Sequence, residues 1–247
     1  MEDTGWIQTY TGRQFYPMAP LAQDICIEDI AHALSQMCRF TGHTREFYSV
    51  AQHSVLVSGI VPHDAALWGL LHDAPEAYLA DVARPLKSML PGLADAEQRI
   101  EAAVARRFSL HLPMSECIHA ADLTMLATEQ RDLMAPAPAP WTSIRGIEPL
   151  LSPIVPWDPC VAEWRFIDRF YILTDVEFQT REFQLGDRIV DAKFPSMRGE
   201  VLEISSMYYT IRCASGNGGL AYIPRRYARS AVAPVSPWTR SGAGHAM

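Results

Sequence analysis

The chain has 247 residues, of which 49% are hydrophobic and 20% charged, and its formal net charge is −7. It contains no run of the roughly 20 apolar residues that a membrane-spanning helix requires, and its first residues, Met1-Glu2-Asp3-Thr4-Gly5, lack the features of a signal peptide. These properties exclude a membrane protein and predict a globular protein of the cytoplasm.

Cysteine usage and charge distribution narrow the expected function. The five cysteines form no Cys-x-x-Cys pair, so neither a disulfide framework nor a thiolate metal site is expected. Acidic residues outnumber basic ones in residues 1–180, which argues against broad nucleic-acid binding by that part. Residues 181–247 have the opposite balance. Contact of Arg225, Arg226 and Arg229 with a polyanion stays open there, beside the simpler reading of solvated charge.

The first predicted element is a short hairpin over residues 6–16, where aromatic and β-branched side chains surround Thr11-Gly12. Apolar residues then recur at helical spacing from Ile27 until Arg39 and Gly42 interrupt them. A loop or short turn over 81–87 and a long proline-rich connection after Met134 are also expected. Further helices are predicted over about 46–61, from Asp64 to about His72, over about 95–108, from near Ser115, and over about 160–176.

Three of these helices carry a polar side chain within an apolar stripe. The stripes are His53 with Val50, Val57 and Ile60; His72 with Ala65, Trp68 and Gly69; and Asp122 with Ile118, Met125 and Leu126. Gly69 is small and is expected to leave space beside the imidazole of His72. Because buried polar groups need partners, these three side chains are expected to meet.

The sequence contains two His-Asp pairs, and only one is predicted to be functional. His63-Asp64 follows Pro62 at a helix start, where an aspartate caps a helix without any need for a metal. His72-Asp73 instead comes at a helix end, directly before Ala74-Pro75, where the helix must break. A ligand pair for a metal fits that break.

His53, His72, Asp73 and Asp122 together supply two imidazoles and two carboxylates. That mixture suits a borderline divalent cation that also carries water. Hydrolysis is therefore the leading expectation from the residues alone. The metal stays open among Mn, Co, Mg, Zn and Fe, because this ligand set excludes none of them strongly.

Several runs resemble the HD-domain phosphohydrolase superfamily, and most closely the bacterial 5′-deoxynucleotidases and phage-type deoxynucleotide phosphohydrolases. The similarity covers roughly residues 25–175 and is strongest from His72 onward. The runs are Arg39-Phe40, Ser49-Val50-Ala51-Gln52-His53-Ser54, Ala121-Asp122 and His72-Asp73-Ala74-Pro75-Glu76-Ala77-Tyr78-Leu79-Ala80-Asp81-Val82-Ala83-Arg84-Pro85-Leu86-Lys87.

The resemblance implies one divalent ion and a set of roles for named residues. The ion would be bound by His53, His72, Asp73 and Asp122, with open positions for water and a phosphate oxygen. Glu76 matches the acid/base carboxylate of the family, although a first-turn glutamate after Pro75 is an ordinary alternative.

Asp81 matches a carboxylate that the family places near the sugar, and it is expected to be catalytic together with Glu76. The residues implied for substrate binding are Arg39, Phe40, Arg84 and Lys87. Arg39 and Phe40 match an Arg-Trp pair in which the guanidinium engages phosphate and the ring packs where a ribose 2′-hydroxyl would clash. Phe in place of Trp leaves selectivity for deoxyribose open. Arg84 and Lys87 are candidates for phosphate contacts, with solvated charge as the alternative.

Beyond residue 182 the pattern becomes β. Short β-branched or aromatic segments at 188–193, 199–204, 207–213 and 220–223 are separated by turn residues, and Leu185-Gly186-Asp187-Arg188 and Arg198-Gly199-Glu200-Val201 resemble SH3-like barrels. The predicted fold is a mainly α HD-domain helical bundle, residues 1–180, with a small all-β SH3-like barrel, 181–235, and a disordered tail, 236–247.

The sequence therefore predicts a metal-dependent phosphohydrolase of (deoxy)nucleotide phosphoesters, with deoxynucleoside 5′-monophosphates or triphosphates as substrates. A homo-oligomer, a dimer or larger, is expected. The competing hypothesis is an HD-fold protein that binds nucleic acid or another protein and whose β barrel carries the function.

Overall fold

The computed structural model describes residues 5–174 in full and the backbone of the strands at 188–191, 198–204, 208–213, 220–224 and 232–234. The chain divides into two compact units, Met1–Val176 and Glu177–Met247, and each is described by itself. The domain boundary was predicted after residue 180, and the structure divides the chain after Val176. None of the helices among the described residues is long and apolar enough to cross a membrane.

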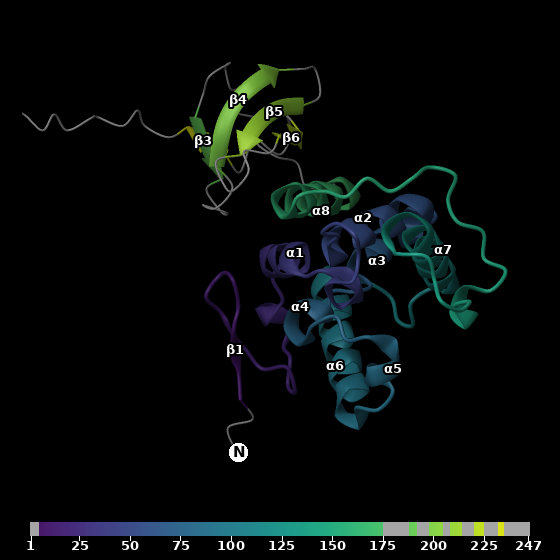
Figure 1. Ribbon diagram of the computed structural model, residues 1–247. Coiled ribbons are helices and arrows are strands. Elements are labelled where there is room, and N and C mark those ends of the chain that lie inside the picture. Colours follow the sequence, from purple (N-terminus) through teal and green to yellow (C-terminus); the bar gives the residue numbers. More distant parts are fainter. Residues whose placement is uncertain are drawn as a thin grey trace, which may run out of the picture. The chain divides into compact units, whose positions relative to one another are not determined.

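The first unit is built from helices and one short hairpin (Figure 1). The hairpin pairs β1 (Ile7–Gln8) with β2 (Gln14–Phe15). The helices are α1 (Ile27–Gln36), α2 (Val50–Ile60), α3 (Ala66–Leu71), α4 (Glu76–Leu79), α5 (Arg84–Lys87), α6 (Pro91–Phe108), α7 (Glu116–Leu133) and α8 (Pro159–Leu173). Single 3-10 turns lie at η1 (Ala22–Asp24), η2 (Arg39–Gly42), η3 (His63–Ala65) and η4 (Thr142–Ile144).

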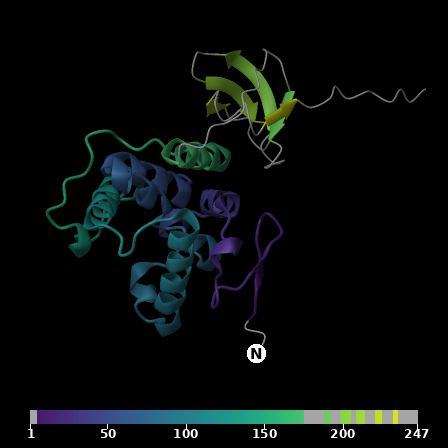
Figure 2. The same ribbon diagram turned by 180° about the vertical axis from the view of Figure 1, so that it is seen from behind.

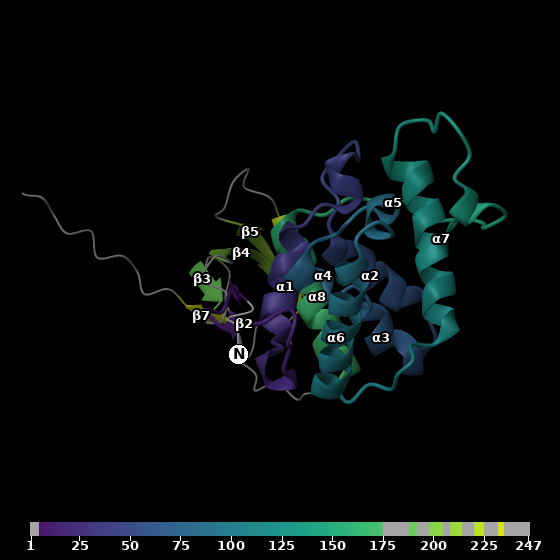
Figure 3. The same cartoon turned by 90° about the horizontal axis from the view of Figure 1, so that it is seen from below.

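α2 is the centre of the helical unit. It contacts α1, α3, α7 and α8, and Figure 3 shows α7 running beside it. Ser49 begins the helix, because its side chain accepts a hydrogen bond from the backbone N–H of Gln52. Since neighbours surround it, the polar Gln52 and His53 are buried along with the apolar Val50 and Val57. A polar group on α2 is therefore held inside the unit.

α3 approaches α2 very closely at Gly69. A Cβ at this position would lie 3.0 Å from Val61 Cγ2 and 3.2 Å from the Ser58 Cα, so a side chain there would push the two helices apart. The predicted role of Gly69, leaving space beside His72, needs revision: the space is used by the backbone of α2. The helix then ends before Pro75, as predicted, in a turn that contains His72 and Asp73.

The N-terminal hairpin is attached to α1. Thr11 donates to the Asp29 carboxylate from its backbone N–H at 2.7 Å and from its hydroxyl at 3.0 Å. Phe15 at the end of the hairpin is fully buried and stacks on Tyr78 with ring centroids 4.0 Å apart. The view from behind in Figure 2 likewise places the hairpin next to α1. The predicted hairpin thus covers one side of the helical unit.

The second unit contains five described strands, β3 (Arg188–Asp191), β4 (Arg198–Ile204), β5 (Tyr208–Cys213), β6 (Leu220–Pro224) and β7 (Val232–Pro234). They pair antiparallel in the order β6-β5-β4-β3-β7. β7 falls on residues for which no strand was predicted.

The predicted fold class, an α bundle joined to an SH3-like barrel, was wrong. Side chains are described only for a helical unit whose sheet has two strands. The strands described in the second unit pair in the row β6-β5-β4-β3-β7, and the described residues show no pairing of β6 with β7. Alternating sequence patterns indicate strands but carry no signal for closure. The predicted tail at 236–247 and Arg225, Arg226 and Arg229 lie outside the described residues.

Candidate metal centre

Three separate helical segments bring four predicted ligands together. His53 lies in the middle of α2, His72 and Asp73 lie in the turn after α3, and Asp122 lies in the first half of α7. One ligand atom each from His53, His72 and Asp122 lie within 4.8 Å of one another. His53 is fully buried, while the other three are partly exposed, so the cluster is open on one side.

The shortest distances run between atoms that can bind a cation. His53 Nε2 is 3.3 Å from His72 Nε2 and 3.3 Å from Asp122 Oδ1. Asp73 Oδ2 is 3.2 Å from His72 Nε2 and 3.6 Å from His53 Nε2. All four predicted ligands therefore face one small volume, with Asp73 on the side of the two imidazoles.

The hydrogen bonds on the far side of each imidazole fix where its proton lies. His72 Nδ1 is 2.9 Å from the carbonyl oxygen of Gly69, which can only accept. His53 Nδ1 is 2.6 Å from Oε1 of Glu129. In neutral rings with a protonated Nδ1, both Nε2 atoms carry lone pairs. Two lone pairs and two carboxylate oxygens then face each other with no donor among them, an arrangement that a cation stabilises.

In the metal-free protein a proton serves this purpose. Burial and the charge of Arg39 oppose protonation of His53, but Glu129 and Asp122 outweigh them and raise the pKa of His53 to about 9. Burial by itself would raise the pKa of Asp122, but its hydrogen bond with His53 and the charges of the nearby imidazoles lower that pKa to about 2. The cluster thus attracts positive charge, which is the electrostatic condition for binding a metal.

Asp73 is ionised in these surroundings despite its burial. Burial disfavours its charge, but His72, His53 and Arg39 hold the pKa of the carboxyl far below its usual range. Its Oδ2 atom is buried and lies 3.2 Å from His72 Nε2 and 3.5 Å from Arg39 Nη1. Arg39 compensates part of the carboxylate charge gathered here, and a cation between the donor atoms would compensate the rest. The donor set therefore fits a divalent metal.

Glu129 is a residue of the site for which the sequence predicted no role. It is fully buried on α7. It bonds to His53 Nδ1, receives a hydrogen bond from the Tyr48 hydroxyl at 2.9 Å, and lies 3.1 Å from Arg39 Nη2. A carboxylate behind a metal-binding histidine orients the ring and increases its basicity. The available signal was its position seven residues after Asp122, on the same helical face.

Glu76 begins α4, one turn of chain after Asp73. Burial, together with the charges of Asp73 and Asp81, raises the pKa of Glu76 to about 10. Its Oε2 atom is buried without a hydrogen-bond partner among the described residues. The raised pKa favours the protonated form of Glu76 in the metal-free protein, and a protonated carboxyl is able to donate a proton.

The predicted substrate residues differ in their availability. Arg39 is largely buried and lies 3.5 Å from Asp73, so its charge is already used by the carboxylates of the cluster. Arg84 is 64% exposed, with Nη2 4.0 Å from Asp122 Oδ2. Lys87 is paired with Glu97 at 2.6 Å, which the sequence did not indicate. Arg84 is thus freer than Lys87 to meet a phosphate.

Two further residues with predicted roles lie at or beside unusual backbone. Phe40 has a φ of 54°, and its ring is 5.3 Å from the Arg39 guanidinium. Asp81 follows Ala80, which has a φ of 92°. Burial, with Asp73 also contributing, raises the pKa of Asp81. The unfavourable backbone at Phe40 and Ala80 thus coincides with, or directly precedes, these two residues.

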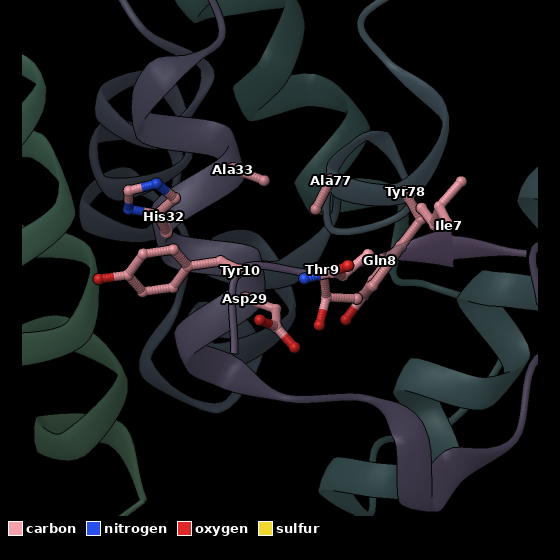
Figure 4. Close-up of a pocket in the computed structure, with 9 residues that line it drawn as sticks. All are labelled: Ile7, Gln8, Thr9, Tyr10, Asp29, His32, Ala33, Ala77 and Tyr78. Atoms are coloured by element: carbon pink, nitrogen blue, oxygen red, sulfur yellow. The ribbon is translucent and has the colours of Figure 1, made fainter. Parts of the chain in front are cut away.

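A separate pocket of about 340 Å³ lies between the hairpin, α1 and α4, away from the predicted ligands (Figure 4). In it the Tyr10 and His32 rings stack at 3.7 Å, and His32 Nδ1 is 3.2 Å from Glu163. The first contact attaches the hairpin to α1, and the second joins α1 to α8. The lining residues are Ile7, Gln8, Thr9, Tyr10, Asp29, His32, Ala33, Ala77 and Tyr78.

Comparison with known proteins identifies relatives. No protein-family model matches the chain. It is 36% identical over 142 residues to an uncharacterized protein of Rhodobacter capsulatus, covering 52% of this chain and 72% of that protein. It is 41% identical over 172 residues to the uncharacterized protein YfdR of Escherichia coli (strain K12), covering 69% of this chain and 97% of YfdR. With almost the whole of YfdR matched at that identity, the chain belongs to the YfdR family.

Proposed function

We propose that the protein is a metal-dependent phosphohydrolase of the HD type, acting on nucleotide phosphoesters and most readily on deoxynucleoside 5′-mono- or triphosphates. One observation carries the proposal. Two imidazole Nε2 atoms and two carboxylate oxygens converge, while Glu129 and the Gly69 carbonyl hold the protons on the opposite ring nitrogens. The resemblance of the run from His72 to Lys87 to HD phosphohydrolases supports it.

His53, His72, Asp73 and Asp122 would hold the divalent ion. When bound, such an ion supplies an activated water at neutral pH and positive charge for a phosphate oxygen. Glu129 keeps His53 in the tautomer whose Nε2 is free to bind. Arg39 balances the negative charge of Asp73 and Glu129 from the buried side, leaving the partly exposed side for substrate.

Glu76 would control the proton. Because its carboxyl stays protonated at neutral pH in the metal-free protein, it can give that proton to an oxygen of the leaving group and recover one from water. Asp81 would face the sugar, and the exposed Arg84 would approach the phosphate. Each of these proposed roles rests on the position of the residue near His53, His72, Asp73 and Asp122.

The test combines metal analysis with a substrate panel. The purified protein, stripped of metal and supplied separately with Mn, Co, Mg, Zn or Fe, is assayed for phosphate release from deoxynucleoside and ribonucleoside mono-, di- and triphosphates. We expect activity with at least one metal and none after chelation. Retained activity in the His72→Ala, Asp73→Ala double variant would overturn the proposal. Equal cleavage of ribonucleotides would overturn the selectivity expected from Phe40.

A further inference from the structure

The turn after α1 has a backbone that ordinary residues avoid. Phe40 and Thr41 have φ/ψ of 54°/33° and 53°/30°, and Gly42 follows with a φ of 79°. Three consecutive residues are therefore left-handed, although two of them carry a Cβ that makes this conformation unfavourable. Strain of this kind persists only where the surroundings enforce it, and it gathers at functional positions.

The strained turn places an aromatic ring beside a second one from a distant part of the chain. The rings of Phe40 and Trp141 have centroids 5.9 Å apart and are tilted by 50°. Trp141 directly precedes η4, after the proline-rich run that follows α7. The Arg45 backbone N–H donates to the Leu133 carbonyl at 2.9 Å and fastens the turn to the end of α7. We call Phe40 and Trp141 the aromatic pair.

The aromatic pair adjoins the metal centre through Arg39. The guanidinium of Arg39 is 5.3 Å from the centre of the Phe40 ring, and its Nη1 atom is 3.5 Å from Asp73 Oδ2. A single residue thus separates a metal ligand from the pair. Trp141 is only half-buried, so part of the indole is open to a ligand.

We propose that the exposed part of Trp141, held in place by the Phe40 ring, stacks on the base of the nucleotide whose phosphate is held at the metal centre, and that Trp141 is a specificity-determining residue. This inference rests on the proposed function and adds the base to it. Flat aromatic side chains stack on the π-face of any nucleobase. A larger base covers more of the indole, so purine nucleotides are preferred to pyrimidine nucleotides. The strain at Phe40 is the cost of aiming its ring at Trp141.

The experiment compares Trp141→Ala with wild type on two substrates. One is a deoxypurine 5′-monophosphate, and the other is deoxyribose 5-phosphate, which has the same sugar and phosphate but no base. Stacking of one base is worth a factor of roughly ten or more in binding. We expect the KM for the nucleotide to rise by about that factor, while kcat and the KM for the base-free substrate stay unchanged. Trp141→Phe should restore most of the loss.

Trp157 provides the matched control. It is half-buried on the same connection and packs against Arg165 at 4.4 Å. Trp157→Ala should leave the KM for both substrates unchanged. The inference is overturned if Trp141→Ala affects both substrates equally, affects neither, or behaves as Trp157→Ala does. A Trp141→Ala protein that fails to fold is replaced by Trp141→Leu, which keeps apolar volume but removes the flat ring.

A binding measurement separates this inference from the proposed function. If wild type releases no phosphate from any substrate, the phosphohydrolase proposal fails. Calorimetry of the manganese-loaded protein with the deoxypurine monophosphate then tests the pair directly. Binding that weakens about tenfold in Trp141→Ala, but not in Trp157→Ala, supports the pair. Absence of binding to wild type, or equal binding by all three proteins, overturns it.

Discussion

The dipeptide His-Asp occurs twice, nine residues apart, and its two copies have different surroundings. His63-Asp64 lies in η3, where both side chains are exposed. His72-Asp73 lies at the other end of α3, where His53 from α2 and Asp122 from α7 meet it. The chemistry of the two pairs is identical. Only the second pair is surrounded by segments that supply further ligands and remove water.

The segments around a His-Asp pair, rather than the dipeptide itself, determine whether a site forms. α3 lies between the two pairs, and Gly69 lets this helix approach the backbone of α2 at Ser58. The close approach brings His72 within 3.3 Å of His53. At the first pair no such neighbour exists among the described residues, so His63 and Asp64 remain ordinary surface residues.

The largest expected effect comes from removing each pair in turn. The His72→Ala, Asp73→Ala protein should no longer bind one divalent metal per chain, because two of the four proposed ligands are gone. Its rate of phosphate release should fall on the order of 100-fold or more. The His63→Ala, Asp64→Ala protein should keep both. Metal content by mass spectrometry and phosphate release measure the difference. Similar losses in the two double variants would show that the comparison is mistaken.

Glu76→Gln is expected to have the second largest effect. Three residues after Asp73 the chain has Glu76, whereas three residues after Asp64 it has Leu67. Glutamine keeps the shape of the protonated acid but has no proton to transfer, so kcat should fall by about 100-fold or more while metal content stays at the wild-type level. Steady-state kinetics beside metal analysis checks this. A loss of metal in parallel with kcat would instead make Glu76 a ligand.

Glu129→Gln should weaken metal binding without abolishing it. The amide can still accept from His53 Nδ1 but no longer increases the basicity of the ring, and loss of such a partner usually lowers metal affinity by about 10- to 100-fold. The matched control is Glu163→Gln, since Glu163 is also buried beside a histidine, His32. Competition with a chelator measures the affinity. Equal weakening in both variants would point to a general loss of stability.

That His53, His72 and Asp122 meet could be predicted from the sequence, because each is a polar residue that interrupts an apolar helical stripe. The break expected at Pro75 distinguished His72-Asp73 from His63-Asp64, and the structure brings His72-Asp73 to the other two residues. Glu129 could not be assigned in the same way. Its role depends on contacts with Tyr48 and Arg39. These residues belong to other segments, and the spacing of residues along α7 does not predict where those segments lie.

Other features depended on long-range geometry and were beyond local patterns. The order in which the strands of the second unit pair depends on contacts between distant segments, which the local alternation of side chains does not specify. Lys87 was considered for phosphate binding, but α6 brings Glu97 to it. The left-handed turn at Phe40 and Thr41 could not be predicted from the sequence either, since Phe and Thr rarely adopt that conformation.

The smallest expected effect is on stability, and it depends on pH. Burial raises the pKa of Glu76 from 4.5 to about 10 in the folded, metal-free protein. Below pH 4.5 the carboxyl is protonated in both the folded and the unfolded state and contributes no difference. As the pH rises above that value the unfolded state loses this proton while the folded state keeps it, so the stability of wild type falls relative to Glu76→Gln.

The measurement is thermal unfolding of wild type and Glu76→Gln in chelator from pH 4.5 to 8. The variant should gain on the order of 1–3 kcal/mol over wild type across this window, which corresponds to a rise in Tm of several degrees. His53, Asp73 and Asp122 titrate in both proteins, so their contributions cancel in the difference. A gap that is constant with pH would show that Glu76 is already ionised beside Asp73. It could not then serve as the proton donor that separates the second His-Asp pair from the first.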